Sequence, residues 1–250
     1  MKYFILLFFA PIFCKAQFAR FDQILKSPDT SFYNVKGATI IYPIVRTGNK
    51  KCDSAINIII KDTLFSWITD SLNKPANVLL DTFIKNGLTY MNYEVTFNDK
   101  GILSFNVALE DDRGADYSTS HFYFNFNLKS GKQLLIGDII NTSSVSDFKF
   151  EVLKDKRDSL IKYKNVDLKE IQTEDTSFTE GYYDALAESA DSCMKSGSLE
   201  NYILTDSTIE IVDDCNGWFS QAATEPYYHL IYYYRVIEHF LNKKFARLIR

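Results

Sequence analysis

Residues 90–109 read YMNYEVTFNDKGILSFNVAL, and this stretch decides the fold. Polar and apolar residues alternate on both sides of a polar turn at residues 98–101, which is the pattern of a β-hairpin. Residues 121–128 continue the theme as HFYFNFNL, in which three successive phenylalanines are spaced two apart. On a strand such residues share one face. The sequence therefore predicts an antiparallel meander with one apolar face.

The segment before the meander predicts two helices and one strand. Apolar residues recur every three or four positions over residues 53–72, which indicates an amphipathic helix with Asp53 as its cap. Residues 76–85 predict a second helix, ended by an Asn-Gly pair. Residues 36–45 predict a strand, and Pro43 places it at a sheet edge or at the strand's end.

The second half repeats the mixture of helices and strands. We expect helices at residues 148–163, 181–195 and 236–249. A hairpin is expected at residues 201–212 and a last strand at residues 227–234. Loops are expected at residues 110–120, 167–179 and 213–225. The predicted class is therefore α+β, with antiparallel sheets, helices packed on one face and two related modules. The predicted boundaries are an irregular lead at 17–35, then modules at 36–140 and 141–250.

Residues 1–16 have the pattern of an export signal. One positive charge precedes an apolar run at residues 4–13, and small residues lie just before Gln17, as in a cleaved secretory signal peptide. The run is shorter than the about 20 apolar residues that span a bilayer, and no later stretch approaches that length. We therefore expect no transmembrane segment and a periplasmic or secreted product cleaved near Ala16. The alternatives are a retained, buried segment and lipidation of Cys14.

Composition and charge narrow the function. The 250 residues are 46% hydrophobic and 24% charged, which excludes a wholly disordered chain. The formal net charge is −4, and loss of Lys2 and Lys15 with the signal takes it to −6. A negative chain has no attraction for a phosphate backbone, so nucleic-acid binding is excluded as a main role.

Three cysteines remain after removal of the signal: Cys52, Cys193 and Cys215. An exported protein can form disulfides, but an odd number leaves at least one thiol unpaired. We favour a Cys193–Cys215 disulfide, because these two lie 22 positions apart around a predicted strand. Three free, buried cysteines are the alternative.

No catalytic or metal-binding motif is present, and we expect no catalytic residue, metal or cofactor. The three histidines are scattered, without the spacing of a metal site. The densest carboxylate cluster runs from Glu110 to Asp116, and Asp112 and Asp116 are its candidates for ligand binding. A solvated acidic loop is the plainer interpretation. A hydrolase using this cluster is a further, weaker one.

Aromatic residues supply the other binding candidates. Five tyrosines crowd residues 227–234, and we take Tyr232 and Tyr234 as candidates for stacking on a sugar or a protein. Trp218, in a predicted loop, is the third. Simple packing in the core or under the loop is the alternative for all of them.

The order of these elements resembles the extracytoplasmic module of peptidoglycan deacetylases of the PdaC type and of RsiV-type anti-sigma factors. The resemblance covers residues 36–241. Its clearest part is residues 125–140 (NFNLKSGKQLLIGDII), which match the pattern n-f-d-L-k-t-G-k followed by l-x-l-x-D-l-f. The matched positions are Leu128, Gly131, Lys132 and Asp138.

The C-terminal half resembles the partner domain found in the same proteins. Residues 201–211 resemble its strand pattern f-y-l-t-d-x-x-i-x-i, and residues 231–241 resemble its later pattern i-x-y-x-x-v/l-x-x-y/f-L. Residues 114–117 (GADY) depart from the family's g-a-h-p loop, since they contain neither His nor Pro. The resemblance implies an extracytoplasmic, non-catalytic module and, in RsiV-type relatives, the binding of lysozyme. The sequence therefore predicts an envelope binding module for a protein partner, with a peptidoglycan- or carbohydrate-binding domain as the alternative.

Overall fold

The computed structural model describes residues 18–26, 39–68, 73–112, 117–170, 181, 199–213 and 228–250. These residues form a six-stranded sheet and a three-stranded sheet, so the predicted α+β class is confirmed. The strands of the larger sheet lie in chain order. They are β1 (Arg20–Lys26), β2 (Ile40–Arg46), β3 (Leu88–Asp99), β4 (Ile102–Asp112), β5 (Tyr117–Asn127) and β6 (Lys132–Gln133).

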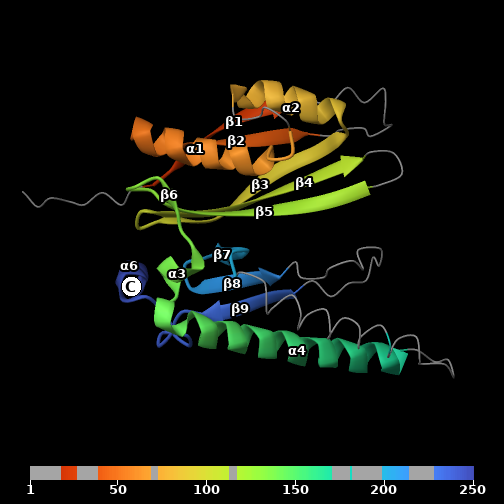
Figure 1. Cartoon of the computed structure of the whole chain (residues 1–250), viewed down its shortest axis with the longest axis vertical. Helices are drawn as coiled ribbons and strands as arrows, with labels where there is room; N and C mark the ends of the chain where they lie inside the picture. Colours follow the sequence, from red (N-terminus) through yellow and green to blue (C-terminus); the bar gives the residue numbers. More distant parts are fainter. Residues whose placement is uncertain are drawn as a thin grey trace, which may run out of the picture.

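Two helices cover one face of the larger sheet (Figure 1). They are α1 (Lys50–Leu64) and α2 (Ala76–Lys85). Both lie in the connection between β2 and β3, and these two strands pair in parallel, because a chain that crosses over the sheet returns in the same direction. All other pairings in the sheet are antiparallel. Ile56 and Ile60 of α1 are fully buried against Phe124 and Phe126 of β5 and their neighbours in one core.

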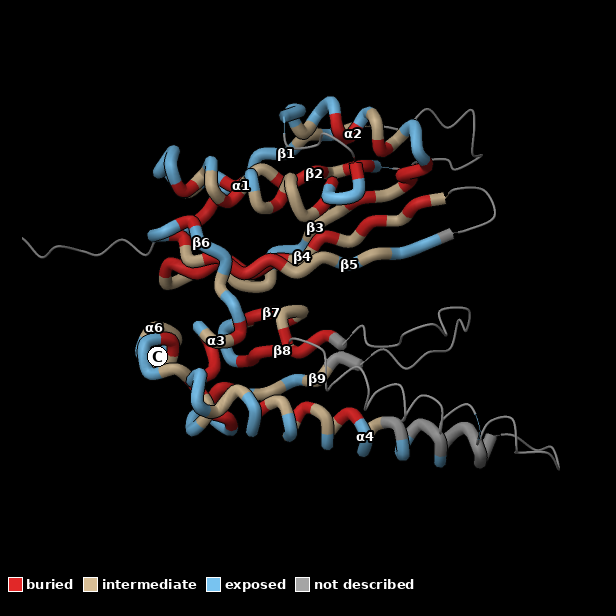
Figure 2. The backbone as a smooth tube through the Cα atoms, viewed as in Figure 1, coloured by how far each residue is buried: buried red, intermediate tan, exposed pale blue. Residues whose placement is uncertain are grey.

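The predicted irregular lead is wrong, because β1 pairs along its whole length with β2. Most of β1 is exposed or half-buried, as Figure 2 shows, so its sequence lacks the strong alternation of a buried strand. The prediction that Pro43 marks an edge or an end is wrong for the strand as a whole, although β3 pairs with β2 only at Ile40 and not at Pro43. Pro43 lies inside β2 opposite Gln23, and β2 has β1 on one side and β3 on the other.

The Asn57 side chain explains why β2 tolerates this proline. Asn57 Oδ1 accepts the N–H of Val45 at 2.8 Å, and Asn57 Nδ2 donates to the Val45 carbonyl at 2.8 Å. Val45 thus turns its backbone away from β1. Because this direction alternates along a strand, Pro43 faces the same way as Val45, and its missing N–H removes no hydrogen bond to β1.

Helix α1 begins and ends earlier than predicted. Asn49 caps it, accepting the N–H groups of Lys51 and Cys52, whereas the predicted cap, Asp53, accepts from the N–H and hydroxyl of Thr47. The helix ends at Leu64 rather than at residue 72. Helix α2 has the predicted bounds.

The hairpin is confirmed, with a tighter turn than predicted. Only Lys100 and Gly101 form it, both with positive φ (54° and 79°), and Asn98 and Asp99 belong to β3. The expected acidic loop after β4 is shorter too. Strand β4 extends to Asp112 and β5 begins at Tyr117.

The smaller sheet packs on the other face of the larger one, with its strands in the order β7-β8-β9 (Figure 1). These strands are β7 (Tyr202–Leu204), β8 (Thr208–Asp213) and β9 (Tyr228–Tyr233). Helix α4 (Val145–Glu170) lies beneath them, and α6 (Lys243–Ile249) lies at one end. A short helix, α3 (Ile136–Ile139), and a 3₁₀ turn, η2 (Thr142–Ser144), precede α4.

Two predictions for the second half need correction. Helix α4 continues to Glu170, into the expected loop, and the terminal helix spans only Lys243–Ile249, preceded by turns from residue 234. The hairpin at residues 201–212 and the last strand are confirmed. Residues 1–17, and all of the predicted helix at residues 181–195 except Gly181, lie outside the described residues.

Side chains of the larger sheet complete the open edge of the smaller one. Strand β7 pairs with β8 through alternate residues, so Tyr202 and Leu204 direct their backbone groups the other way. Asn125 Nδ2 donates to the Tyr202 carbonyl at 2.8 Å, and Ser104 Oγ accepts the N–H of Leu204 at 3.0 Å. Both bonds are buried. They attach one sheet to the other without a shared strand pairing.

Candidate functional site

A pocket of about 490 Å³ opens at one end of the smaller sheet. It lies between the turn that joins β7 to β8, the end of β9 and helix α6, so it draws on three segments of the chain. Its size falls within the range of small-ligand and anchor-residue pockets. The lining residues are Asp206, Ser207, Tyr233, Tyr234, Arg235, Glu238, Leu241, Ala246, Ile249 and Arg250.

Two consecutive tyrosines have opposite roles in this pocket. The Tyr233 side chain is 50% exposed, and the Arg235 guanidinium lies 5.5 Å from its ring centre, within cation–π range. Tyr234 points inward, is 8% exposed and donates its hydroxyl to the Thr205 carbonyl. Burial raises the pKa of Tyr234 far above its usual value, so this hydroxyl stays protonated.

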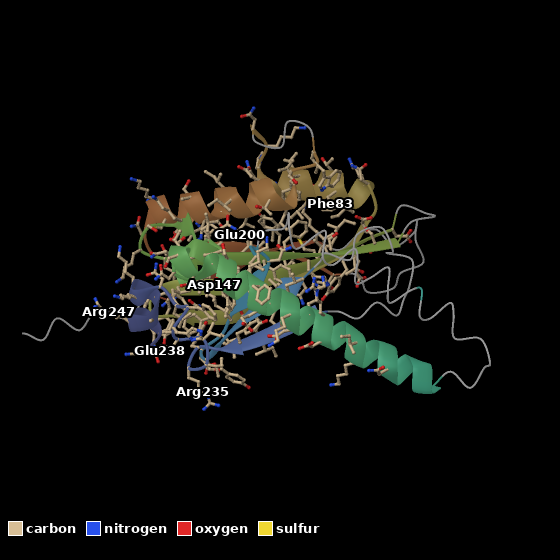
Figure 3. The ribbon with its side chains drawn as sticks, turned by 60° about the horizontal axis from the view of Figure 1, so that its bottom comes forward. Phe83, Asp147, Glu200, Arg235, Glu238 and Arg247 are labelled. Atoms are coloured by element: carbon tan, nitrogen blue, oxygen red, sulfur yellow. The ribbon has the colours of Figure 1, made fainter. Side chains whose placement is uncertain are left out.

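Charged side chains of both signs surround the exposed tyrosine. Glu238 forms an ion pair with Arg250, and Asp206 lines the same pocket. Figure 3 shows Arg235 and Glu238 at the same end of the molecule, projecting from its surface. Arg247 of α6 also projects there, but it does not line the pocket. The pocket therefore offers an aromatic ring with both cations and carboxylates around it.

Hydrogen bonds hold the frame of the pocket. In the β7–β8 turn, Thr205 Oγ1 accepts the N–H groups of Ser207 and Thr208. Asn242 caps α6 and donates its own N–H to Ile139 of α3. Lys100, in the hairpin turn of the larger sheet, donates to the Ile249 carbonyl of α6. These hydrogen bonds hold the β7–β8 turn and both ends of helix α6 in place around the pocket.

The structure does not bring the predicted binding residues together. Tyr232 faces the core, where its ring meets Phe148 edge-on and its hydroxyl donates to Asp155 at 2.9 Å. Its pKa is raised, first by burial and then by the Asp155 charge. Asp112 is the last residue of β4 in the larger sheet and does not line the pocket. Its N–H donates to the Gly87 carbonyl. Asp116, Trp218, Cys193 and Cys215 lie outside the described residues.

Sequence reasoning missed Tyr233, Arg235, Glu238 and Arg250. Alternation along β9 places Tyr233 on the opposite face from Tyr232 and Tyr234. It does not say which face is buried, because tyrosine is found on both buried and exposed faces of strands. The exposed Ile231, on the same face as Tyr233, is the opposite of what a hydrophobicity rule predicts.

Three of the four positions that carried the family resemblance have structural roles here, and the fourth, Lys132, is exposed. Leu128 is fully buried. Gly131 has a φ of 70° and lies so close to α1 that a Cβ there would be 2.9 Å from the Cα of Cys52. Asp138 accepts the N–H of Leu135 at the start of α3. Near it, Glu200 accepts the N–H of Ile136, and desolvation together with the charge of Asp138 raises the Glu200 pKa.

Two kinds of feature are absent from the described residues. No helix among them is long and apolar enough to cross a membrane. No three His, Cys, Asp or Glu side chains among them gather closely enough to hold a metal ion.

Comparison with solved structures finds similar folds, among them two proteins of the DUF3298 family. One is a member from Bacteroides fragilis, with a TM-score of 0.56 and 13% identity, covering 94% of this chain and 99% of that one. The other is from Pseudomonas aeruginosa, with a TM-score of 0.52 and 12% identity, covering 91% and 95%. No family model and no curated protein matches this sequence. At such identities the likeness concerns the fold alone.

Proposed function

We propose that this chain is an exported binding module of the cell envelope, of the PdaC/RsiV type, which acts without catalysis of its own. The pocket beside Tyr233 is its contact site for a protein partner. The order of sequence elements over residues 36–241 supports the family type, and the signal-like residues 1–16 support export.

The observation that carries this proposal is the half-exposed Tyr233 ring with Arg235 above it. Tyrosine and arginine are over-represented among residues that dominate the free energy of protein–protein binding, since both bury a large area and still hydrogen-bond. Ile231, 52% exposed on the same face of β9, extends the apolar surface beyond the pocket. A partner covering this face would bury the aromatic ring and meet charges of both signs.

A cationic envelope-active protein such as lysozyme fits this proposal. The chain without its signal has a net charge of −6, and opposite net charges raise the rate of encounter. Arg250 neutralises Glu238 within the pocket, so Asp206 is the carboxylate most available to a cationic side chain of the partner.

The test is binding of the exported full chain to immobilised lysozyme at low salt. Tyr233→Ala and Arg235→Ala should each weaken binding at least tenfold, the loss expected for a central contact. Arg247→Ala, on α6 outside the pocket, is the matched control and should change the affinity less than threefold. No retention of the wild-type chain at low salt would exclude lysozyme as the partner.

A glycan ligand is the second candidate, because Tyr233 provides a ring for stacking while Asp206 and Glu238 provide acceptors for sugar hydroxyls. Binding to purified peptidoglycan, lost in Tyr233→Ala or in Trp218→Ala, would favour this candidate over the first. Peptidoglycan binding unaffected by either variant would place the glycan site elsewhere.

A further inference from the structure

The hairpin turn between β3 and β4 contacts helix α6, although the turn belongs to the larger sheet and α6 packs with the smaller one. Lys100 Nζ donates a hydrogen bond to the carbonyl of Ile249, the last residue of α6. Ile102, directly after the turn, lies in the same hydrophobic core as Phe245 of α6. The larger sheet therefore holds the end of a helix that borders the pocket at Tyr233.

Lys100 has a backbone conformation that lysine rarely adopts. Its φ is 54°, and within the described part of the chain it is the only residue other than glycine with a positive φ. A side chain with a Cβ is strained in this region, and two-residue hairpin turns favour Asn or Gly there. Strain of this kind persists where the surrounding structure or a function requires the residue. The lysine at this position therefore calls for a specific reason.

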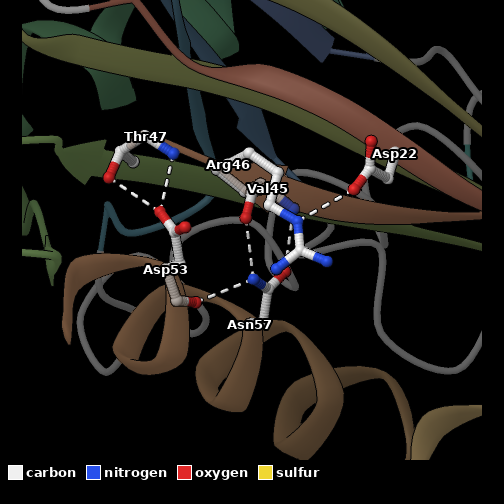
Figure 4. A network of polar contacts seen from close by, with 6 residues as sticks. All are labelled: Asp22, Val45, Arg46, Thr47, Asp53 and Asn57. Atoms are coloured by element: carbon white, nitrogen blue, oxygen red, sulfur yellow. Dashed lines mark hydrogen bonds and ion pairs between the residues drawn. The ribbon is translucent and has the colours of Figure 1, made fainter. Parts of the chain in front are cut away.

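Other side chains that join separate elements of the fold lie in regular structure. Asn57 bonds both backbone groups of Val45 from within α1 (Figure 4). Asn125 bonds the Tyr202 carbonyl from within β5. Neither asparagine has a positive φ. Joining two elements does not in itself require backbone strain, so the strain at Lys100 follows from its place in the turn.

The bond from Lys100 acts on residues that line the pocket. Ile249, which accepts it, is a lining residue, as is the next residue, Arg250, which forms the ion pair with Glu238. Lys100 itself does not line the pocket. Its ammonium group suits the unsatisfied carbonyls at the C-terminal end of a helix. Glycine would relieve the strain but has no side chain to form this bond, and the asparagine side chain is much shorter.

We propose that Lys100 is a positioning residue for the contact site at Tyr233, an inference that rests on the proposed function of that site. The hydrogen bond fixes the last turn of α6 and thereby places Arg250 beside Glu238. Without it the end of α6 frays, and one wall of the pocket moves. The larger sheet thus sets the geometry of a pocket whose lining comes from the smaller sheet and α6.

The test compares Lys100→Met, Lys100→Arg and Lys129→Met in the full chain. Methionine removes the ammonium group but keeps a long, unbranched side chain on the same backbone, whereas arginine keeps a charged donor. Lys129 is the matched control, because its Cε lies 3.6 Å from where a Cβ on Gly101 would be. Its removal deletes the same charge beside the same turn without deleting the bond to Ile249.

The first measurement is hydrogen exchange of the α6 amides by mass spectrometry, which needs no partner. Lys100→Met should raise exchange over residues 243–249 about tenfold, as for loss of a hydrogen bond from a charged donor. Lys100→Arg and Lys129→Met should stay within about twofold of wild type. Exchange in β3 and β4 should not change, because a general loss of stability would raise it there as well.

The second measurement is binding to immobilised lysozyme, which Lys100→Met should weaken about fivefold and Lys100→Arg should restore. Unchanged exchange of α6 in Lys100→Met would overturn the inference whether or not lysozyme binds. Unchanged binding of Lys100→Met, in a chain that loses binding through Tyr233→Ala, would overturn it too. If the wild-type chain does not bind lysozyme, the proposed partner fails, and the exchange of α6 alone decides the role of Lys100.

Discussion

The Asn125 side chain donates a buried 2.8 Å hydrogen bond to the carbonyl of Tyr202, 77 residues further along the chain. The two residues belong to different sheets, so a side-chain amide supplies the hydrogen bond that the backbone of a neighbouring strand would otherwise supply. Asn57 does the same for Val45 in β2, and Asn98 bonds both backbone groups of Ala19. Three asparagines thus complete backbone pairing at positions where strand partners run out.

Loss of the Asn125 amide should destabilise the protein. In Asn125→Ala the Tyr202 carbonyl is left buried without its donor, which costs about 1–3 kcal/mol in the free energy of unfolding. Urea denaturation followed by circular dichroism measures this. Asn106→Ala, half-buried on the neighbouring strand, is the control and should cost about 0.5 kcal/mol or less. Equal losses for both variants would contradict the role of Asn125.

Alanine substitutions at Gly131 and Gly48 distinguish the cost of backbone strain from the cost of a steric clash. Both have positive φ, but a Cβ at Gly131 would be 2.9 Å from the Cα of Cys52, whereas a Cβ at Gly48 meets nothing within 4 Å. Gly48→Ala should therefore cost about 1 kcal/mol for the backbone alone. Gly131→Ala should cost roughly 2–4 kcal/mol, because α1 must also move. Thermal melts of the two variants make the comparison, and similar melting temperatures would refute it.

The raised pKa of Glu200 predicts a pH dependence of stability. The folded protein binds this proton more tightly than the unfolded chain does, so the stability due to Glu200 is fully present below its unfolded pKa. It is lost as the pH rises through the higher folded value. Glu200→Gln keeps an acceptor for the Ile136 N–H and removes the charge beside Asp138.

The Glu200→Gln variant should therefore gain stability over wild type as the pH rises from 4 to 7, with little difference at pH 4. Urea midpoints at a series of pH values measure the gain. Parallel curves for the two proteins would show that Glu200 is not desolvated as described.

Thiol counting tests the predicted disulfide. Cys52 is free and buried, and its Sγ donates to the Lys129 carbonyl at 3.4 Å, so it should react slowly with a thiol reagent in the native protein. Unfolded in urea without reductant, the chain lacking its signal should show one thiol, and after reduction three. Three thiols before reduction would mean that Cys193 and Cys215 are not joined.

The strands and helices with clear periodicity were predictable from sequence. The phenylalanines of β5, the hairpin turn and the bounds of α2 followed from alternation and from turn residues. Strand β1 did not, because only Phe21 and Ile24 contact the core, and the rest of the strand is polar except for Leu25, which is exposed. The cap of α1 is not predictable in this way, because Asn49 and Asp53 are both good caps; in the structure Asn49 accepts the first N–H groups of the helix and Asp53 accepts from Thr47.

The candidate site was less predictable, for a physical reason. Asp206, Arg235 and Arg250 come from a turn, a strand end and a helix end, and no local spacing relates them. The sequence does not distinguish Tyr233 from its two neighbours, because which face of a strand is buried depends on what packs against it. Here Phe148 of α4 packs against β9, and its ring contacts the Tyr232 ring edge-on.

The covered edge of β7 also protects the protein against association with other copies of itself. An uncovered strand edge is a template for association with a further chain, and natural sheets block such edges. Here Ser104 and Asn125 occupy the hydrogen-bonding positions that an intruding strand would need. Replacing them with apolar residues would therefore do more than loosen the fold: it would open a route to oligomers and fibres under conditions in which the native molecule stays dispersed.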